Sequence, residues 1–200
     1  MKKLFLTNAL LIFFSMGICA QGSNSGAEKK QENGLGKSLI VFYTWSGNSR
    51  IIANELHTII GGDIVEIIPA KPYTRDYNQM IEAAKQEIAE IDRGKYPAVN
   101  NPVGNIADYD TVFIVYPLWW SHMASPMQTF LHNQSAKLRG KTLALICISA
   151  SSGISQTVAD ARRLCPNSKF TEALHLYSSE IRGAKNQLIA WLEKTGLNRK

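Results

Sequence analysis

Apolar residues recur along the chain in two alternating patterns: short continuous runs and stretches with helical spacing. The continuous runs are typical of buried strands and cover residues 38–43, 63–68, 111–115, 141–149 and 171–176. Apolar side chains at spacings of three and four predict helices over residues 49–60, 76–91, 125–133, 153–164 and 182–195. The fifth run, TEALHL, is less apolar than the others, which suits a strand at the edge of a sheet.

This alternation of strands and helices determines the fold class. A parallel connection crosses over the sheet through a helix, so the pattern predicts a parallel sheet with helices on both faces. We therefore expect an α/β fold with a doubly wound five-stranded parallel sheet. Ligands of such sheets bind beyond the carboxyl ends of the strands. The loops after the first, third and fourth strands are thus the candidate functional segments.

The loop after the first strand has the composition of an anion site. It is TWSGNSR and runs directly into a helix, whose first N–H groups lack partners and carry positive potential. Thr44, Ser46 and Ser49 supply hydroxyl donors, and Gly47 allows the backbone to approach a ligand closely. The alternative is an ordinary helix cap by Ser46 or Asn48. A cap needs only one such residue, and this loop has an excess of them.

The other two loops predict a site for a flat ligand. The third strand is followed by YPLWWSH, in which Trp119 and Trp120 offer a stacking surface for an amphipathic ring system. Packing of both indoles over the edge of the core is the alternative. The fourth strand is followed by SASSGIS, whose small side chains leave room for a ligand edge and expose main-chain amides. An ordinary capped Ser/Gly loop is the alternative there.

Together, Ser-Gly-Asn-Ser at residues 46–49 and Tyr-Pro-x-Trp-Trp at residues 116–120 resemble the flavodoxin-like family, over residues 38–196. The resemblance implies an FMN cofactor and the strand order 2-1-3-4-5 of the short-chain form. It implies that the FMN phosphate is held by Thr44, Ser46, Gly47, Asn48, Ser49 and Arg50. It also implies that the isoalloxazine ring is flanked by Tyr116, Pro117, Leu118, Trp119, Trp120, Ser151 and Gly153.

The function implied by the resemblance is that of an FMN-binding flavoprotein in electron transfer or oxidoreduction. One alternative is an NAD(P)H-dependent quinone-type reductase, which needs a pocket beside the flavin for a second flat molecule. Residues 71–77 and 94–105 are the segments that could wall this pocket. A flavin-free binding module on the same fold is the other alternative. The electron acceptor is expected to be a redox partner protein or a small molecule.

Catalytic residues stay unassigned at this stage, and no metal site is expected. His122 is the one candidate proton donor near the expected ring, and an incidental surface histidine is the alternative.

The N-terminus has the three parts of a secretory signal. Two lysines precede an apolar stretch that ends in the small residues Cys19 and Ala20. We expect residues 1–20 to be a signal peptide, residues 21–37 a flexible Gly/Ser-rich linker, and residues 38–200 the folded domain. This predicts an exported, periplasmic protein without a membrane span in its mature part. A permanent membrane anchor and a lipid anchor at Cys19 are the alternatives.

Charge and cysteine content narrow the picture further. Without residues 1–20 the chain has 20 basic and 16 acidic residues, and it has no basic run of the kind that binds nucleic acid. Flavodoxins that carry electrons are generally acidic, and this chain is basic. The difference bears on which redox partner the protein has more than on which cofactor it binds. Cys147 and Cys165 are separated by a loop and a helix, which predicts two free thiols, since a disulfide needs Cα atoms within about 7 Å.

Overall fold

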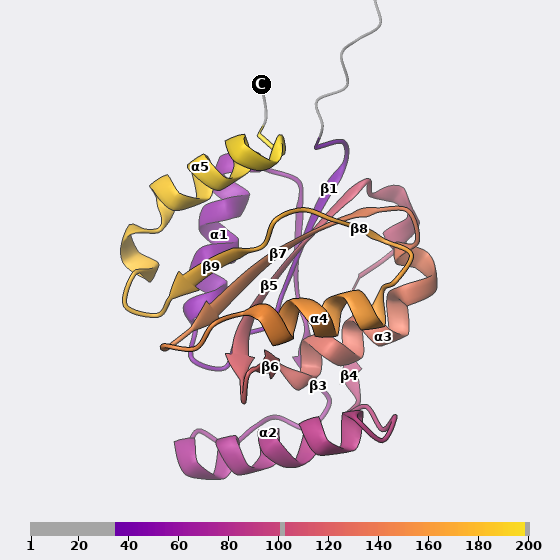
Figure 1. The fold of residues 1–200 in the computed structure, drawn as a ribbon, viewed down its shortest axis with the longest axis vertical. Coiled ribbons are helices and arrows are strands. Elements are labelled where there is room, and N and C mark those ends of the chain that lie inside the picture. Colours follow the sequence, from indigo (N-terminus) through magenta and orange to yellow (C-terminus); the bar gives the residue numbers. More distant parts are fainter. Residues whose placement is uncertain (1–34, 101–102, 199–200) are drawn as a thin grey trace, which may run out of the picture. The chain divides into compact units, whose positions relative to one another are not determined.

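The computed structural model describes residues 35–100 and 103–198, whose core is a parallel sheet (Figure 1). The strands of this sheet are β1 (Ser38–Phe42), β2 (Asp63–Glu66), β5 (Thr111–Trp119), β7 (Thr142–Ser149), β8 (Lys169–Phe170) and β9 (Leu174–Tyr177). Their order is β2-β1-β5-β7, with β8 and β9 both pairing with β7 at the far edge. In terms of the five predicted strands this is 2-1-3-4-5, so the predicted fold class is confirmed.

Helices cover both faces of the sheet (Figure 1). They are α1 (Asn48–Ile60), α2 (Tyr77–Ile91), α3 (Ser125–Leu138), α4 (Ser155–Leu164) and α5 (Lys185–Thr195). Helices α1 and α5 pack on one face, and α2, α3 and α4 pack on the other. Successive residues of β1 alternate between these layers, with Leu39 in the core under α2–α4 and Ile40 in the core under α1 and α5. Burial on both faces explains why this strand is a continuous apolar run.

The second predicted strand is divided in the structure. β2 ends at Glu66, and a short strand β3 (Ile68–Pro69) pairs antiparallel with β4 (Val99–Asn100) in a separate two-stranded sheet. Proline has no N–H to donate to a central ladder, so Pro69 is compatible with this edge position and not with a longer β2. The strand β4 lies within residues 94–105, one of the two segments expected to wall a second pocket.

The third predicted strand is longer than expected. Its pairing with β7 continues to Pro117, and β5 then turns back through β6 (His122–Met123) to form a hairpin. Residues 116–119 are therefore strand and not loop, which corrects the sequence prediction. The cause is that β7 is itself long enough to keep the main-chain groups of Tyr116 and Pro117 paired.

Three smaller differences concern the other elements. α3 continues to Leu138, beyond the predicted end at residue 133. The fifth strand is divided into β8 and β9, and the last predicted helix begins as a short 3₁₀ turn, η2 (Ile181–Gly183). A further 3₁₀ turn, η1 (Ile106–Asp108), precedes β5.

The predicted signal, residues 1–20, and most of the predicted linker lie outside the described residues. Leu35 is buried in the core under α1 and α5, and the N–H of Lys37 donates to Asp110, so the fold includes residues before Ser38. No helix in residues 35–100 and 103–198 is long and apolar enough to cross a membrane. In the same residues, no group of acidic, histidine or cysteine side chains is arranged to hold a metal ion.

The prediction of two free thiols is confirmed. Cys147 and Cys165 are both buried and unpaired. Burial raises the pKa of the Cys147 thiol to about 12 and that of the Cys165 thiol to about 11. Both thiols therefore stay protonated and unreactive in the folded protein at neutral pH.

Candidate cofactor site

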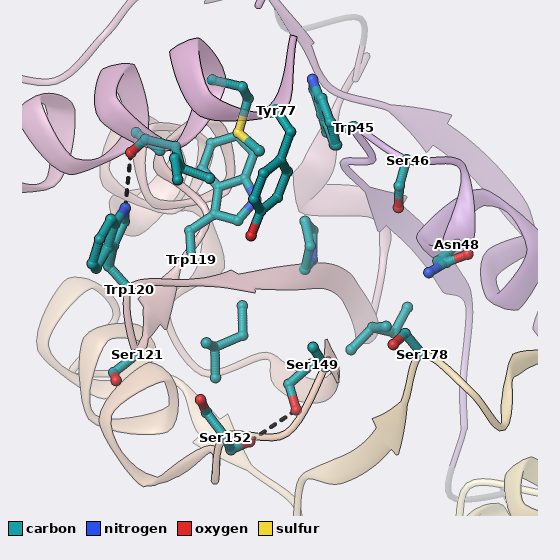
Figure 2. A pocket seen from close by; sticks show the side chains of 17 residues that line it. Trp45, Ser46, Asn48, Tyr77, Trp119, Trp120, Ser121, Ser149, Ser152 and Ser178 are labelled. Carbon is teal, nitrogen blue, oxygen red and sulfur yellow. Dashed lines mark hydrogen bonds between the residues drawn. The ribbon is translucent and has the colours of Figure 1, made fainter. Parts of the chain in front are cut away.

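A cavity of about 570 Å³ lies at the carboxyl ends of the central strands (Figure 2). This volume is within the range of small-molecule and cofactor pockets, about 300–1,000 Å³. Its walls come from the loop after β1, the β5–β6 hairpin, the loop after β7 and helix α2. None of the described residues that line it carries a charged side chain. The lining is therefore uncharged and includes four aromatic side chains, Trp45, Tyr77, Trp119 and Trp120, as a site for a flat neutral ring would.

The loop after β1 forms a tight turn that opens the N-terminus of α1. The N–H of Gly47 donates to the hydroxyl of Thr44 over 2.9 Å, and Gly47 adopts a left-handed conformation with φ 96°. Gly47 itself is the residue before the helix, and no side chain in the described part of the chain caps α1. The alternative of an ordinary cap by Ser46 or Asn48 is thus absent here. The first N–H groups of α1 stay available for an anion.

Three polar side chains of this turn lie in two different environments. Ser46 and Asn48 line the cavity (Figure 2). The hydroxyl of Ser49 is fully buried and has no hydrogen-bond partner among the described residues. Ser38 and Ser125 also have buried hydroxyls without a partner among the described residues, but of these three serines only Ser49 is in the first turn of α1.

Arg50 does not line the cavity, although the resemblance implied a phosphate contact. Its guanidinium forms an ion pair with Glu66 of β2, with Nη2 at 2.6 and 2.8 Å from the two carboxylate oxygens. The pair is partly exposed, so its contribution to stability is small. The positive charge of Arg50 is therefore paired with the carboxylate of Glu66.

The β5–β6 hairpin brings the two tryptophans to the cavity in different ways. Trp119 is buried and packs edge-on against Tyr43 and Tyr73. The centroid of its ring lies 5.4 Å from that of Tyr43 and 5.1 Å from that of Tyr73. Trp120 is 48% exposed, and its Nε1 donates to the main-chain oxygen of Ile81 over 2.8 Å (Figure 2). Both indoles line the cavity, together with Pro117 and Leu118.

Tyr116 is the residue of this segment that the structure does not bring to the cavity. Its side chain is fully buried in the core, and its hydroxyl forms a hydrogen bond with Thr157 of α4. Because residue 116 is still part of the central strand, its side chain is enclosed between the sheet and α4. The expectation that Tyr116 flanks a bound ring is therefore not met by its position.

The loop after β7 contributes through other residues than expected. Ser149, Ala150 and Ser152 line the cavity, whereas Ser151 and Gly153 do not. The Ser149 hydroxyl donates to the main-chain oxygen of Ser152 over 2.8 Å, and His175 Nε2 lies 2.8 Å from the same hydroxyl. These bonds hold the loop in a compact shape beside the cavity.

Helix α2 supplies a wall that the sequence interpretation missed. Tyr77, Met80, Ile81 and Ala84 of this helix line the cavity, and Trp45 completes the same wall. The signal was present, because Tyr77, Met80 and Ala84 belong to the apolar spacing that predicted this helix. A stripe at helical spacing does not show whether it faces a core or a cavity. Ser178, which follows β9, was also missed, and no pattern marks it.

The two segments expected to wall a substrate pocket meet at a second cavity of about 310 Å³, which is lined by Lys71 and Tyr73 from one segment and by residues 97–99 from the other. Of the described residues in these segments, only Tyr77 lines the cofactor cavity. The hydroxyl of Tyr73 donates to the Glu87 carboxylate in that second cavity. Burial raises the pKa of Glu87 above its ordinary value, although the Tyr73 hydrogen bond opposes this. Burial also raises the pKa of Tyr73.

His122 has a defined partner and does not line the cavity. Its Nδ1 lies 3.1 and 3.2 Å from the two oxygens of Asp160, whose side chain is only 2% exposed. This contact places His122 at the base of the hairpin tip, against α4.

These observations define a class of protein: a doubly wound α/β domain with an uncapped helix N-terminus beside an aromatic-lined cavity at one edge of the sheet. A family model described as flavodoxin matches residues 37–195. The chain therefore belongs to the flavodoxin family. A search of curated protein sequences finds no match.

Solved structures share this fold. A Bacteroides eggerthii protein assigned as a flavoprotein is 29% identical, with a TM-score of 0.69 over 80% of this chain and 98% of that chain. A similar protein from Bacteroides uniformis is 24% identical, with a TM-score of 0.67 over 79% and 98% of the two chains. A Lactobacillus acidophilus flavoprotein in complex with FMN is 20% identical, with a TM-score of 0.62 over 74% and 97%.

Proposed function

We propose that this protein binds FMN in the cavity at the carboxyl edge of the sheet and uses it in electron transfer or oxidoreduction. The observation that carries the proposal is the N-terminus of α1, which has no side-chain cap in the described chain and encloses the unpartnered hydroxyl of Ser49. A bound phosphate would satisfy both the free N–H groups and this hydroxyl. The adjoining cavity suits a flat ring, and FMN joins a phosphate to such a ring.

The residues present fit this cofactor without further change. Asn48 and Ser49 would donate their main-chain N–H groups to the phosphate, together with the hydroxyls of Ser46 and Ser49. Trp119 and Trp120 would border the ring from the hairpin side, and Ser149, Ala150 and Ser152 from the side of β7. Bound FMN supplies hydride and electron transfer. The protein orients the ring, and its uncharged lining keeps carboxylates away from a ring that gains electrons.

Titration of the purified protein with FMN, and in parallel with riboflavin, tests this proposal. We expect the flavin absorbance to shift with FMN and the affinity for riboflavin to be lower, because riboflavin lacks the phosphate. Equal affinity for the two would show that the α1 N-terminus is not a phosphate site. No absorbance change with either flavin would overturn the proposal and leave only the family membership.

A reductase that acts on a small flat acceptor is the second candidate function. The specific observation that favours it is the apolar wall of α2, which extends the cavity beyond the loops that would hold the cofactor. Tyr77 on this wall is 61% exposed and lies beside Trp45, with ring centroids 6.1 Å apart. Because the lining is uncharged, the acceptor that suits it is a neutral aromatic molecule, such as a quinone.

Anaerobic addition of NADH or NADPH to the FMN complex separates the two functions. Bleaching of the flavin followed by reoxidation with a soluble quinone would favour the reductase. Absence of bleaching would favour an electron carrier whose electrons come from a partner protein.

We also propose that the protein is exported to the periplasm, with residues 1–20 as its signal. The support is the sequence pattern alone, a basic start followed by an apolar stretch and small residues. Fractionation of cells that produce the full chain, with N-terminal sequencing of the product, tests this. An intact Met1 in the cytoplasmic fraction would refute it, and a lipid on Cys19 would identify a lipoprotein.

A further inference from the structure

The tip of the β5–β6 hairpin has an unfavourable backbone conformation. Trp120 and Ser121 have φ angles of 50° and 68°, and they are the only non-glycine residues in the described chain with positive φ. Two-residue hairpin turns of this kind normally use Asn-Gly or Gly-Gly, because a Cβ atom disfavours the left-handed region. Such a turn persists only where its surroundings hold it in place. Both residues line the cofactor cavity, so the conformation has a direct effect on the site.

Asp160 of α4 holds the strand that leaves this turn. One of its carboxylate oxygens accepts the main-chain N–H of Met123 over 3.1 Å and lies 3.1 Å from His122 Nδ1. The other accepts from Gln156 Nε2 over 3.3 Å. The Arg163 guanidinium lies 3.8 Å from this second oxygen. The Asp160 side chain is 2% exposed, so these four contacts together replace the water that the buried carboxylate loses. His122 and Met123, the two residues that follow the turn, both contact this buried carboxylate. Asp160 is therefore directed at the hairpin.

The hairpin is also held from two other directions. Gln128 of α3 donates its Nε2 to the main-chain oxygen of Met123 over 2.7 Å. The Trp120 indole donates to Ile81 of α2, and the Lys85 ammonium lies 5.3 Å from the centre of its ring. The strained tip is therefore fastened to α4 and α3 at its base and to α2 at its end. Of these contacts, only Asp160 introduces a buried negative charge.

We propose that Asp160 is a positioning residue of the cofactor site, whose carboxylate keeps the hairpin in the conformation that places Trp120 in the cavity wall. This inference rests on the proposed function, since it assigns Asp160 an effect on FMN binding. Asp160 does not line the cavity, so it acts through His122, Met123 and the turn that precedes them. Loss of its hydrogen bonds would release the strained turn and let the indole leave the wall.

The first experiment compares Asp160→Ala and Asp160→Asn with Thr157→Val as a matched control. Thr157 lies one turn earlier on α4 and is also buried and hydrogen-bonded, but to Tyr116 in the core and not to the hairpin tip. We expect Asp160→Ala to weaken FMN binding about tenfold or more, because it removes hydrogen bonds to a charged group. Asp160→Asn, which can still accept from Met123, should have a smaller effect. Thr157→Val should lower the melting temperature without a comparable loss of affinity.

Hydrogen exchange of the flavin-free proteins gives a readout that does not depend on FMN. In both Asp160 variants the amides of residues 118–124 should exchange faster than in the parent, while those of β1 and β7 should not. Unchanged exchange at residues 118–124 in Asp160→Ala would overturn the proposal, whatever happens to stability.

A double-mutant cycle with Trp120→Ala tests the route of the effect. If Asp160 acts by placing Trp120, Asp160→Ala should cost little further FMN affinity in the Trp120→Ala background. If the losses of FMN affinity in Asp160→Ala and Trp120→Ala simply add in the double variant, the proposed route is overturned. Failure of the parent protein to bind FMN would overturn the proposed function together with this inference. Normal FMN binding by Asp160→Ala would overturn the inference alone.

Discussion

The Nε1 of Trp120 donates a hydrogen bond to the main-chain oxygen of Ile81, 2.8 Å away. This bond joins two walls of the same cavity, the β5–β6 hairpin and helix α2, which have no sequence-local connection. Ile81 O belongs to the helical ladder of α2, so the indole is an additional donor to it. The bond therefore adds little to helix stability and chiefly determines where the exposed indole lies.

Removal of this donor should loosen the cavity more than the fold. We expect Trp120→Phe to weaken FMN binding several-fold and to change the melting temperature only slightly, because the exposed carbonyl can bind water instead. Trp191→Phe is the matched control, since Trp191 Nε1 makes an equivalent 2.8 Å bond to Glu172 outside the cavity. Flavin titrations and thermal melts of both variants provide the measurement. Equal losses of affinity in the two would contradict the role of the Trp120 bond.

Ser49→Ala should separate cofactor binding from stability. The Ser49 hydroxyl is buried without a partner in the described chain, so its removal should leave the flavin-free protein equally stable or more stable. FMN affinity should fall about tenfold or more, because a hydrogen bond to a charged phosphate is lost. Riboflavin affinity should stay the same, and this comparison is the internal control. A parallel loss for riboflavin would indicate a general disturbance of the loop and not a phosphate contact.

The strands buried on both faces are the part of the fold that the sequence predicts best. β1 and β7 read as continuous apolar runs because each residue contacts a helical layer on one face or the other. The hairpin after β5 is not predictable in this way. Its turn uses Trp120 and Ser121 in the left-handed region, where sequence preferences predict Gly or Asn, and tertiary contacts from Asp160 and Ile81 override them.

In the candidate site, too, the parts determined by local sequence are predictable and the parts determined by tertiary packing are not. The loop at Gly47 is predictable, because a helix N-terminus and its composition are local properties. The wall formed by α2 is not, because Met80 both packs in the core and borders the cavity, and its spacing is the same for either role. The resemblance implied that Tyr116 flanks the ring, and the sequence pattern ended the strand before it. Only the length of its ladder with β7 shows that it is enclosed.

Glu87 should make stability depend on pH in a particular direction. Burial raises its pKa in the folded state, so the folded protein holds this proton more tightly than the unfolded chain does. Below the ordinary glutamate range both states are protonated and the residue costs nothing. As the pH rises from there through the raised pKa, the folded state loses stability, because it must ionise a buried group.

Glu87→Gln should remove this dependence, since glutamine stays neutral and can still accept from Tyr73. We expect the variant to melt at a higher temperature than the parent at pH 8, and the difference to shrink towards pH 4. Glu82→Gln, on the exposed side of the same helix, is the control and should show no such trend. A variant that is less stable than the parent at pH 8 would contradict the direction of the shift.

Both described thiols should be unreactive until the protein unfolds. The pKa values of about 12 for Cys147 and about 11 for Cys165 leave almost no thiolate at pH 8, and both side chains are buried. In a Cys19→Ser chain, we expect no reaction with a thiol-specific disulfide reagent in the native state and reaction of both thiols in denaturant. Rapid labelling of the native protein would mean that the core around β7 opens readily.

Tyr77 offers a test of whether the α2 wall receives a second substrate. Tyr77 is 61% exposed, lines the cavity and lies beside Trp45, but it is on none of the three loops that would hold the cofactor. If the protein is a reductase, Tyr77→Ala should raise the KM for a neutral quinone several-fold and leave FMN affinity nearly unchanged, because aromatic stacking contributes about 0.5–1.5 kcal/mol. Tyr177→Phe is a control at another exposed aromatic outside the cavity lining. A change in FMN affinity with an unaltered KM would instead place Tyr77 against the flavin, and the same wall would then serve an electron carrier.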